Sequence, residues 1–142
     1  MNRIDIKAVV IAFVAEFCVD IVVMSMLIGI FGRGQLDPDM AEAEFKAALE
    51  AINAQGDFQL AVFVSGMVTV VLGGYLVARI AKGFPYYNGL AIGVVGVAFT
   101  LAFAAGNPLW FTILAVLLTI PLSIYGAHLA TKHRPAQADG SR

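Results

Sequence analysis

Two acidic residues, Glu16 and Asp20, lie within an otherwise apolar segment and are the residues of this 142-residue chain best suited to chemistry. An acidic side chain at the centre of a membrane helix costs roughly 2.5–3.5 kcal/mol on insertion scales, and such residues are typically functional. Because they are four positions apart, both occupy one face of a helix. The pattern indicates a site that binds protons or cations, or a docking point for a partner helix.

No basic residue is expected to neutralise this pair. Arg79 and Lys82 belong to the cytoplasmic end of the second expected span and His128 to that of the fourth, so none of them reaches the same depth. Burial and mutual repulsion favour the neutral form, and we expect at least one carboxyl to be protonated near pH 7 and the two to titrate together. In an alternative that stays open, protonated acids only hold the bundle together. The polar neighbours that we expect are Ser65, Thr69, Thr119 and Ser123.

The elements that position these residues are predicted to be membrane spans. Hydrophobic residues make up 60% of the chain and charged residues only 13%, which is too apolar for an ordinary soluble domain. A bilayer core needs about 20 apolar helical residues for each crossing. Four stretches satisfy this length, so we expect an all-α, four-transmembrane-helix bundle over residues 1–131. The expected spans are residues 6–31, 58–82, 86–105 and 109–130.

Glycine and proline residues shape the third and fourth spans. Gly106, Asn107 and Pro108 divide one long apolar region into two spans joined by a tight hairpin. Gly89 and Gly93 have the GxxxG spacing that lets helices approach closely, either within the bundle or, alternatively, between copies of the chain. Pro121 predicts a kink in the fourth span, which either opens a polar cavity beside the acidic pair or only shapes packing.

The distribution of charge predicts the orientation in the membrane. Basic residues near the ends of spans stay in the cytoplasm. They occur before the first span, between the second and third, and after the fourth, at Arg3, Lys7, Arg79, Lys82, Lys132, His133 and Arg134. Residues 32–57 are mostly acidic and are expected outside. We therefore predict that both termini are cytoplasmic and that residues 132–142, which lack apolar residues to pack, form a disordered tail.

The acidic segment is expected to contain a short amphipathic helix over residues 38–54. Asp37 suits the N-cap position, Pro38 the first helical position, and Gly56 a stop before Asp57 caps the next span. One face of the helix is apolar and either lies on the bilayer or caps the bundle, or else docks a partner. Its apolar residues are Ala41, Phe45, Ala48, Leu49 and Ile52.

Several classes of function are disfavoured by the sequence. Cys18 is the single cysteine, and His128 and His133 lack companions at ligand spacing, so we expect no metal site. No motif for phosphate binding, nucleophilic catalysis or a zinc-binding helix is present. We expect no cofactor, no enzymatic activity and no nucleic-acid partner, and we expect the partners to be the lipid bilayer with another membrane protein or a second copy of the chain.

Two resemblances to known families add to these expectations. The segment GGYLVARIAKGFPYYNGLAIG, from Gly73 to Gly93, resembles small uncharacterised four-helix bacterial membrane proteins. This resemblance implies a bacterial inner-membrane location and no particular activity. The small multidrug resistance transporters are similar in having four short spans and one essential glutamate in the first, a place that Glu16 fills. The acidic segment, the second acid at Asp20 and the absence of their third-span signature depart from that family.

Two functions follow from these observations. The first is a non-enzymatic accessory or interaction subunit that engages other membrane components through the acidic face of the first span and the outer helix. The alternative is a proton-coupled small-molecule carrier or cation pathway in which Glu16 and Asp20 exchange protons with the substrate. The sequence favours the first, because the acidic pair has no partner of its own.

Overall fold

A computed structural model describes residues 3–37 and 39–132, and these residues form five helices and no strand. The helices are α1 (Ile6–Phe31), α2 (Glu42–Asn53), α3 (Gly56–Ile80), α4 (Pro85–Ala102) and α5 (Leu109–Lys132). Within the described residues, all but α2 are long and apolar enough to cross a membrane. The predicted all-α fold, with four spans and a short helix between the first two, is confirmed.

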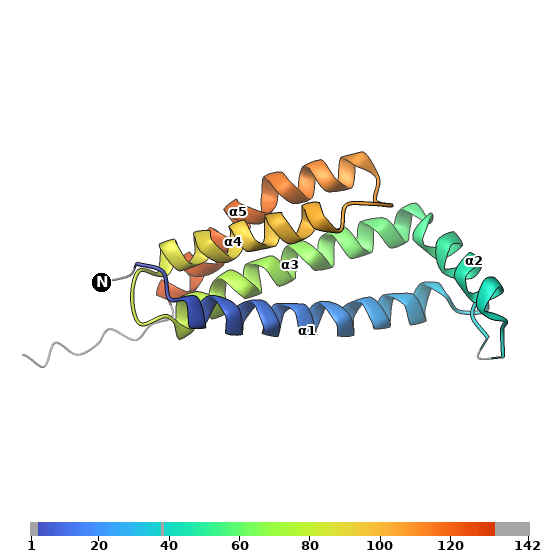
Figure 1. Cartoon of the computed structure of the whole chain (residues 1–142), viewed down its shortest axis with the longest axis horizontal. Helices are drawn as coiled ribbons and strands as arrows, with labels where there is room; N and C mark the ends of the chain where they lie inside the picture. The colour runs from blue at the N-terminus through green and yellow to red at the C-terminus, as the bar shows by residue number, and fades with distance from the viewer. Residues whose placement is uncertain (1–2, 38, 133–142) are drawn as a thin grey trace, which may run out of the picture.

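The four long helices run alongside one another, and α2 extends beyond one end of the bundle (Figure 1). At the centre, α3 contacts each of the other three spans, and its most extensive contact is with α5. By contrast, α1 packs mainly on α3 and touches α4 less. We call the end with α2 the acidic end, and the opposite end, where the chain begins, the basic end.

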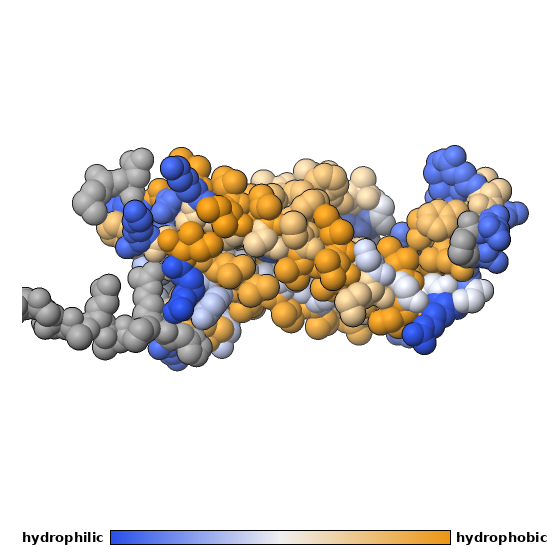
Figure 2. Space-filling view, turned by 90° about the horizontal axis from the view of Figure 1, so that it is seen from below, coloured by the Kyte–Doolittle hydropathy of each residue, from blue (hydrophilic) through white to orange (hydrophobic). Residues whose placement is uncertain are grey.

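The outer surface of the bundle is apolar across its middle. Figure 2 shows hydrophobic residues over this region of one face and hydrophilic residues at its two ends. Large apolar side chains such as Val68 and Leu117 are more than 60% exposed, at 64% and 63%. Lipid is the solvent that can cover such a surface, because soluble proteins rarely expose continuous apolar area on this scale. The chain is therefore a multi-pass membrane protein.

Several glycines allow the central helices to pack closely against one another. A Cβ atom on Gly74 would overlap the backbone of Ser123, and one on Gly126 would overlap the backbone of α3. Gly89 and Gly93 likewise face α5, where a Cβ on Gly89 would lie 2.7 Å from the Cβ of Ala127. The GxxxG pair therefore serves packing within the bundle, since close backbone approach is what small residues allow.

A buried asparagine that the sequence did not single out ties the basic end together. Asn88 of α4 is completely buried. Its side-chain oxygen accepts a hydrogen bond from the backbone N–H of Asp5 at 2.7 Å, and its amide group donates to the carbonyls of Gly83 and Phe84, each at 3.0 Å. Asp5 in turn caps α1 by accepting from the N–H of Ala8 at 3.1 Å. One side chain thus joins the start of α1 to the α3–α4 connection.

The predicted start of the outer helix is wrong. Asp37 does not cap α2; instead its carboxylate accepts from the N–H of Asp39 at 3.0 Å and its carbonyl from that of Met40 at 3.2 Å. These bonds close a separate turn, and α2 begins only at Glu42 with Ala41 as its N-cap. Pro38, expected at the first helical position, lies outside the described residues.

The junction between α2 and α3 also differs from the prediction. Gly56 does not stop the outer helix but is the first residue of α3, and Asp57 lies in the first turn instead of capping it. Asn53 ends α2, where its carbonyl accepts a bond from the side chain of Gln59 at 2.9 Å. A long side chain from α3, rather than a glycine, closes this junction.

Further boundaries shift. The second span ends at Ile80 instead of residue 82, and the third begins at Pro85 instead of residue 86. The third span ends at Ala102, earlier than the expected Ala105, because the chain unwinds before Gly106, which has a φ of 90°. The last helix continues to Lys132 and runs as one helix past Pro121. The predicted disordered tail otherwise falls on residues 133–142, which lie outside the described residues.

Asn88→Ala tests the link at the basic end. The substitution removes the side-chain partner of the Asp5 N–H and of the Gly83 carbonyl, both partly buried, while the carbonyl of Phe84 keeps the backbone N–H of residue 88. Each buried group left unsatisfied costs about 1–3 kcal/mol. We expect a clearly lower melting temperature in detergent. Asn107→Ala removes an exposed amide that bonds to Phe103 at 3.3 Å and serves as the control. Equal melting temperatures for the two variants would show that the Asn88 bonds contribute little.

Candidate functional site

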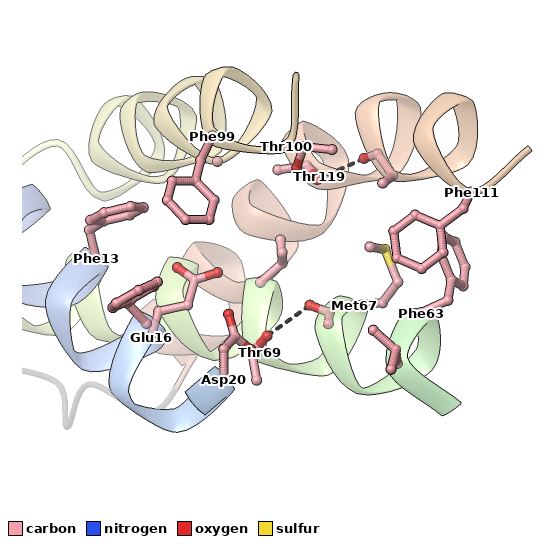
Figure 3. Close-up of a pocket in the computed structure, with 16 residues that line it drawn as sticks. Phe13, Glu16, Asp20, Phe63, Met67, Thr69, Phe99, Thr100, Phe111 and Thr119 are labelled. Atoms are coloured by element: carbon pink, nitrogen blue, oxygen red, sulfur yellow. Dashed lines mark hydrogen bonds between the residues drawn. The ribbon is translucent and has the colours of Figure 1, made fainter. Parts of the chain in front are cut away.

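A cavity of about 160 Å³, partly open to the surface, lies between the spans, and all four of them contribute to its wall. Glu16 and Asp20 enter it from α1, and Figure 3 shows both carboxyl groups among the residues that line it. The remaining lining is apolar or hydroxyl-bearing, and no described residue in the wall is basic. The structure therefore brings the two acids together in a cavity without a resident positive charge.

The half-buried side chain of Glu16 packs against α3, which has no side chain at Gly73 to exclude it. A Cβ atom built on Gly73 would overlap Oε2 of Glu16 and lie 2.8 Å from its Cδ. The carboxyl group thus occupies the volume that any other residue at position 73 would fill. A glycine in a helix interior destabilises the helix by about 1 kcal/mol relative to alanine, and here it makes space for the acid.

Asp20 lies one helical turn from Glu16, beside the hydroxyl of Thr69 (Figure 3). Thr69 is buried, and its hydroxyl donates to the carbonyl of Gly66 at 2.9 Å. A hydroxyl has one proton and two lone pairs. Thr69 can therefore keep its bond to Gly66 and accept from a protonated Asp20, or turn and donate to the carboxylate. This neighbour suits both protonation states of the acid.

Phenylalanine rings form two walls of the cavity. Near Glu16, the ring of Phe99 meets those of Phe13 and Phe17 edge to face, with centroids 5.7 Å apart in both pairs. On the side of the acidic end, Phe63 meets Phe111 at 5.4 Å. The faces of aromatic rings carry partial negative charge and attract cations. Both the acids and the rings thus favour a positively charged ligand.

A second cavity, of about 220 Å³, lies toward the acidic end and adjoins the first. Val62 and Phe111 line both cavities. The side chains of Asn53, Gln59 and Asn107 make the second cavity more polar. Toward the basic end, by contrast, packed side chains of α1, α3 and α4 follow the acid cavity, among them Ala12 and Val77, which are fully buried. The acid cavity is therefore bordered by open space toward the acidic end and by packed side chains toward the basic end.

Only part of the predicted polar surroundings belongs to the cavity. Thr69 and Thr119 line it, and Thr119 donates to the carbonyl of Ala115 at 2.7 Å. Ser65 bonds to Val62 in its own helix and does not line the cavity, while Ser123 joins α5 to α4 through the carbonyl of Gly89 at 2.9 Å. Neither serine reaches the acids in this arrangement.

Sequence reasoning did not single out Thr100 or the phenylalanines. Thr100 of α4 lines the cavity, whereas Pro121 is exposed and outside the wall. No periodic pattern distinguishes these residues, because phenylalanines in the cavity wall and apolar residues facing lipid look alike in the sequence. Only the packing of α1 against α3 and α4 assigns them to the interior.

Comparison of the chain with known protein families, with curated proteins and with solved structures found no match. Two carboxyls, a hydroxyl that either donates or accepts, and aromatic walls can bind a cation and can exchange it for a proton.

Gly73→Ala tests whether this glycine makes room for Glu16. The added methyl group competes with the carboxyl for one volume, and overpacking of this kind costs about 1–3 kcal/mol. We expect the variant to unfold at a lower temperature than the unaltered protein. In a Glu16→Ala background the clash disappears, so the same substitution is expected to be harmless, a coupling that a double-mutant cycle measures.

Gly66→Ala is the matched control, because a Cβ there meets nothing within 4 Å. Additive effects of Gly73→Ala and Glu16→Ala would contradict the packing of the acid against Gly73.

Proposed function

We propose that this protein is a proton-coupled carrier of small organic cations, with Glu16 and Asp20 as the binding groups. The observation that carries the proposal is the position of both carboxyls in a cavity between the four spans, partly open to the surface, whose wall contains no basic described residue. The proposed role is non-enzymatic and requires no cofactor. It corresponds to the alternative that the sequence left open.

The geometry favours this role over docking of a partner through the acidic face. That docking requires the carboxyls to face outward from α1, toward a neighbouring protein. Instead, Glu16 contacts the position of Gly73 on α3 and Asp20 lies beside Thr69 of the same helix. The face of α1 that points away from the bundle carries apolar side chains such as Val14 and Val22, which are 53% and 59% exposed. Lipid suffices to cover them.

The size and lining of the cavity suggest the class of ligand. A cavity of roughly 150 Å³ in a protein core holds a molecule the size of benzene. The cavity here, at about 160 Å³, suits a small amine or quaternary ammonium ion. Such a cation offers alkyl groups to Phe13, Phe99 and Phe63 and its charge to the carboxyls and ring faces.

Exchange of a cation for a proton keeps the charge of the site constant. A carboxylic acid that releases one proton becomes a carboxylate, and the arriving monovalent cation restores neutrality. This balance matters because an unpaired charge in a low-dielectric interior is costly. The second cavity, which shares Val62 and Phe111 with the first, is the proposed route from the acidic end.

We further propose that the basic end faces the cytoplasm of a bacterium and that α2 lies outside the inner membrane. Support comes from the described basic residues: Arg3 precedes α1, Lys7 lies in its first turn, Lys82 follows α3, and Lys132 ends α5. The residues of α2 are acidic by comparison, with Glu42, Glu44 and Glu50 against Lys46. This division matches the preference of basic residues for the cytoplasm.

The transport proposal predicts uptake that depends on both acids. Protein in liposomes with an acidic interior is expected to accumulate tetramethylammonium from outside as protons leave. We expect Glu16→Gln and Asp20→Asn each to reduce this uptake at least about tenfold, which corresponds to a loss of about 1.4 kcal/mol in binding. Scintillation counting of the labelled cation checks the result.

The matched control is Glu44→Gln, an exposed acid on α2. Its uptake is expected to equal that of the unaltered protein. Uptake that survives in the Glu16→Gln/Asp20→Asn double variant would overturn the assignment of these residues, and absence of uptake by the unaltered protein for a panel of small amines would overturn the carrier role.

Orientation is tested separately by labelling single cysteines in intact cells with a membrane-impermeant maleimide. In a Cys18→Ser background, a cysteine at position 44 is expected to react and one at position 132 to react only after the membrane is opened. The reverse pattern would place α2 in the cytoplasm.

The accessory-subunit role remains the second candidate because of α2. This helix contacts α3, and its Ile52, which is 1% exposed, lies beside Gly32 at the end of α1, whereas Phe45 nearer its start is 42% exposed. Purification in mild detergent would then recover a companion protein in fixed proportion, lost on Phe45→Ser. Repeated recovery of the chain alone would exclude this role.

A further inference from the structure

A third cavity, of about 450 Å³, opens at the basic end between the start of α1 and the α3–α4 connection. We call it the basic-end cavity, and its wall is formed by Arg3, Ile4, Asp5, Ile6, Lys7, Lys82, Gly83 and Phe84. It shares none of its lining with the acid cavity. The proposed transport function makes no use of it.

The charge of the basic-end cavity is positive. Lys7 and Lys82 are exposed and form no ion pair with a described residue. Arg3 is held in place, because it donates to the hydroxyl of Tyr87 at 3.0 Å and its guanidinium lies 5.3 Å from the centre of that ring. The one acid in the wall, Asp5, is engaged in capping α1 through Ala8. Three basic residues and one acid therefore line the cavity, so its net charge is positive.

Apolar side chains surround these charges. Ile4, Ile6 and Phe84 line the same cavity and are 45%, 69% and 43% exposed. They lie at the boundary where the apolar surface of the bundle gives way to charged residues. A ligand that satisfies this wall needs an anionic group for the lysines and an apolar part for the isoleucines and Phe84. A free inorganic anion supplies only the first.

The loop that presents Lys82 and Phe84 is held in a strained conformation. Phe84 has a φ of 49°, a left-handed conformation that residues other than glycine rarely adopt. The buried side chain of Asn88 maintains it through its bonds to Gly83 and Phe84. Backbone strain that the surrounding structure maintains is typical of ligand-binding sites. This observation is independent of the charges and supports the presence of a ligand-binding site with a defined backbone conformation.

We propose that the basic-end cavity binds the phosphate headgroup of an anionic phospholipid. Lys7 and Lys82 pair with the phosphate, Arg3 contributes a third positive charge, and the first carbons of the acyl chains lie along Ile6 and Phe84. Basic residues at the end of membrane helices attract anionic lipids by charge, and here a cavity gives the attraction a defined place. The lipid would join α1 to the α3–α4 connection at the end where Asn88 already joins them.

Native mass spectrometry of the detergent-purified protein with equal amounts of phosphatidylglycerol and phosphatidylcholine tests the proposal. We expect the unaltered protein to retain mainly phosphatidylglycerol. Lys7→Gln/Lys82→Gln is expected to weaken this retention roughly fivefold for each removed charge. Lys7→Arg/Lys82→Arg keeps both charges and is expected to retain the lipid.

The matched control is Lys46→Gln/Lys132→Gln, which removes two exposed charges that do not line the cavity. It is expected to bind phosphatidylglycerol as the unaltered protein does. Equal losses in the two double variants would show a diffuse charge effect and overturn the site. Displacement of the lipid by millimolar glycerol phosphate would also overturn the proposal, because the site would then bind a soluble phosphate. Retention unchanged in Lys7→Gln/Lys82→Gln would exclude these lysines as ligands.

Discussion

The contact between Glu16 and Gly73 is the constraint on which the rest of the interior depends. A carboxyl group in the middle of a bundle needs volume, and α3 supplies it by having only a hydrogen atom at position 73. The same contact orients α1, because the acid points toward α3 and the apolar side chains of α1 point outward. Asp20 follows one turn later, beside Thr69. The acid cavity exists because these two helices meet through a glycine and a hydroxyl rather than through large apolar side chains.

The two ends of the bundle are built differently. At the basic end, Asn88 joins the start of α1 to the α3–α4 connection, and close glycine contacts join α4 to α5. At the acidic end the helices α4 and α5 are joined by a turn through Gly106, and a second cavity leads toward the acids. A bundle fixed at one end and open at the other is what a binding site with access from one side requires. For the proposed carrier, this is one of the conformations that alternating access requires.

Hydropathy predicted the fold because a membrane span needs only length and apolar composition, and the first span was predicted with its observed ends, Ile6 and Phe31. Local polar chemistry was less predictable: Asp37 was expected to cap the outer helix but closes a turn of its own. The acids were predicted because carboxyls stand out in an apolar segment. Thr100, Phe99 and Asn88 were not, since a threonine, a phenylalanine or an asparagine in such a segment has no distinguishing pattern. Their roles follow from contacts between helices distant in sequence, which one-dimensional periodicity does not encode.

The most direct test of the account asks whether the acid cavity is open to water while the outer surface is covered by lipid. In a Cys18→Ser background, single cysteines replace Thr100, which lines the cavity, and Val68, which is 64% exposed on the outside of α3. The rate of reaction with a small charged thiol reagent is then measured in liposomes. We expect the cysteine at position 100 to be modified, and more slowly when tetramethylammonium is present, while the cysteine at position 68 does not react. An unreactive cysteine at position 100, together with a reactive one at position 68, would contradict a water-accessible acid cavity.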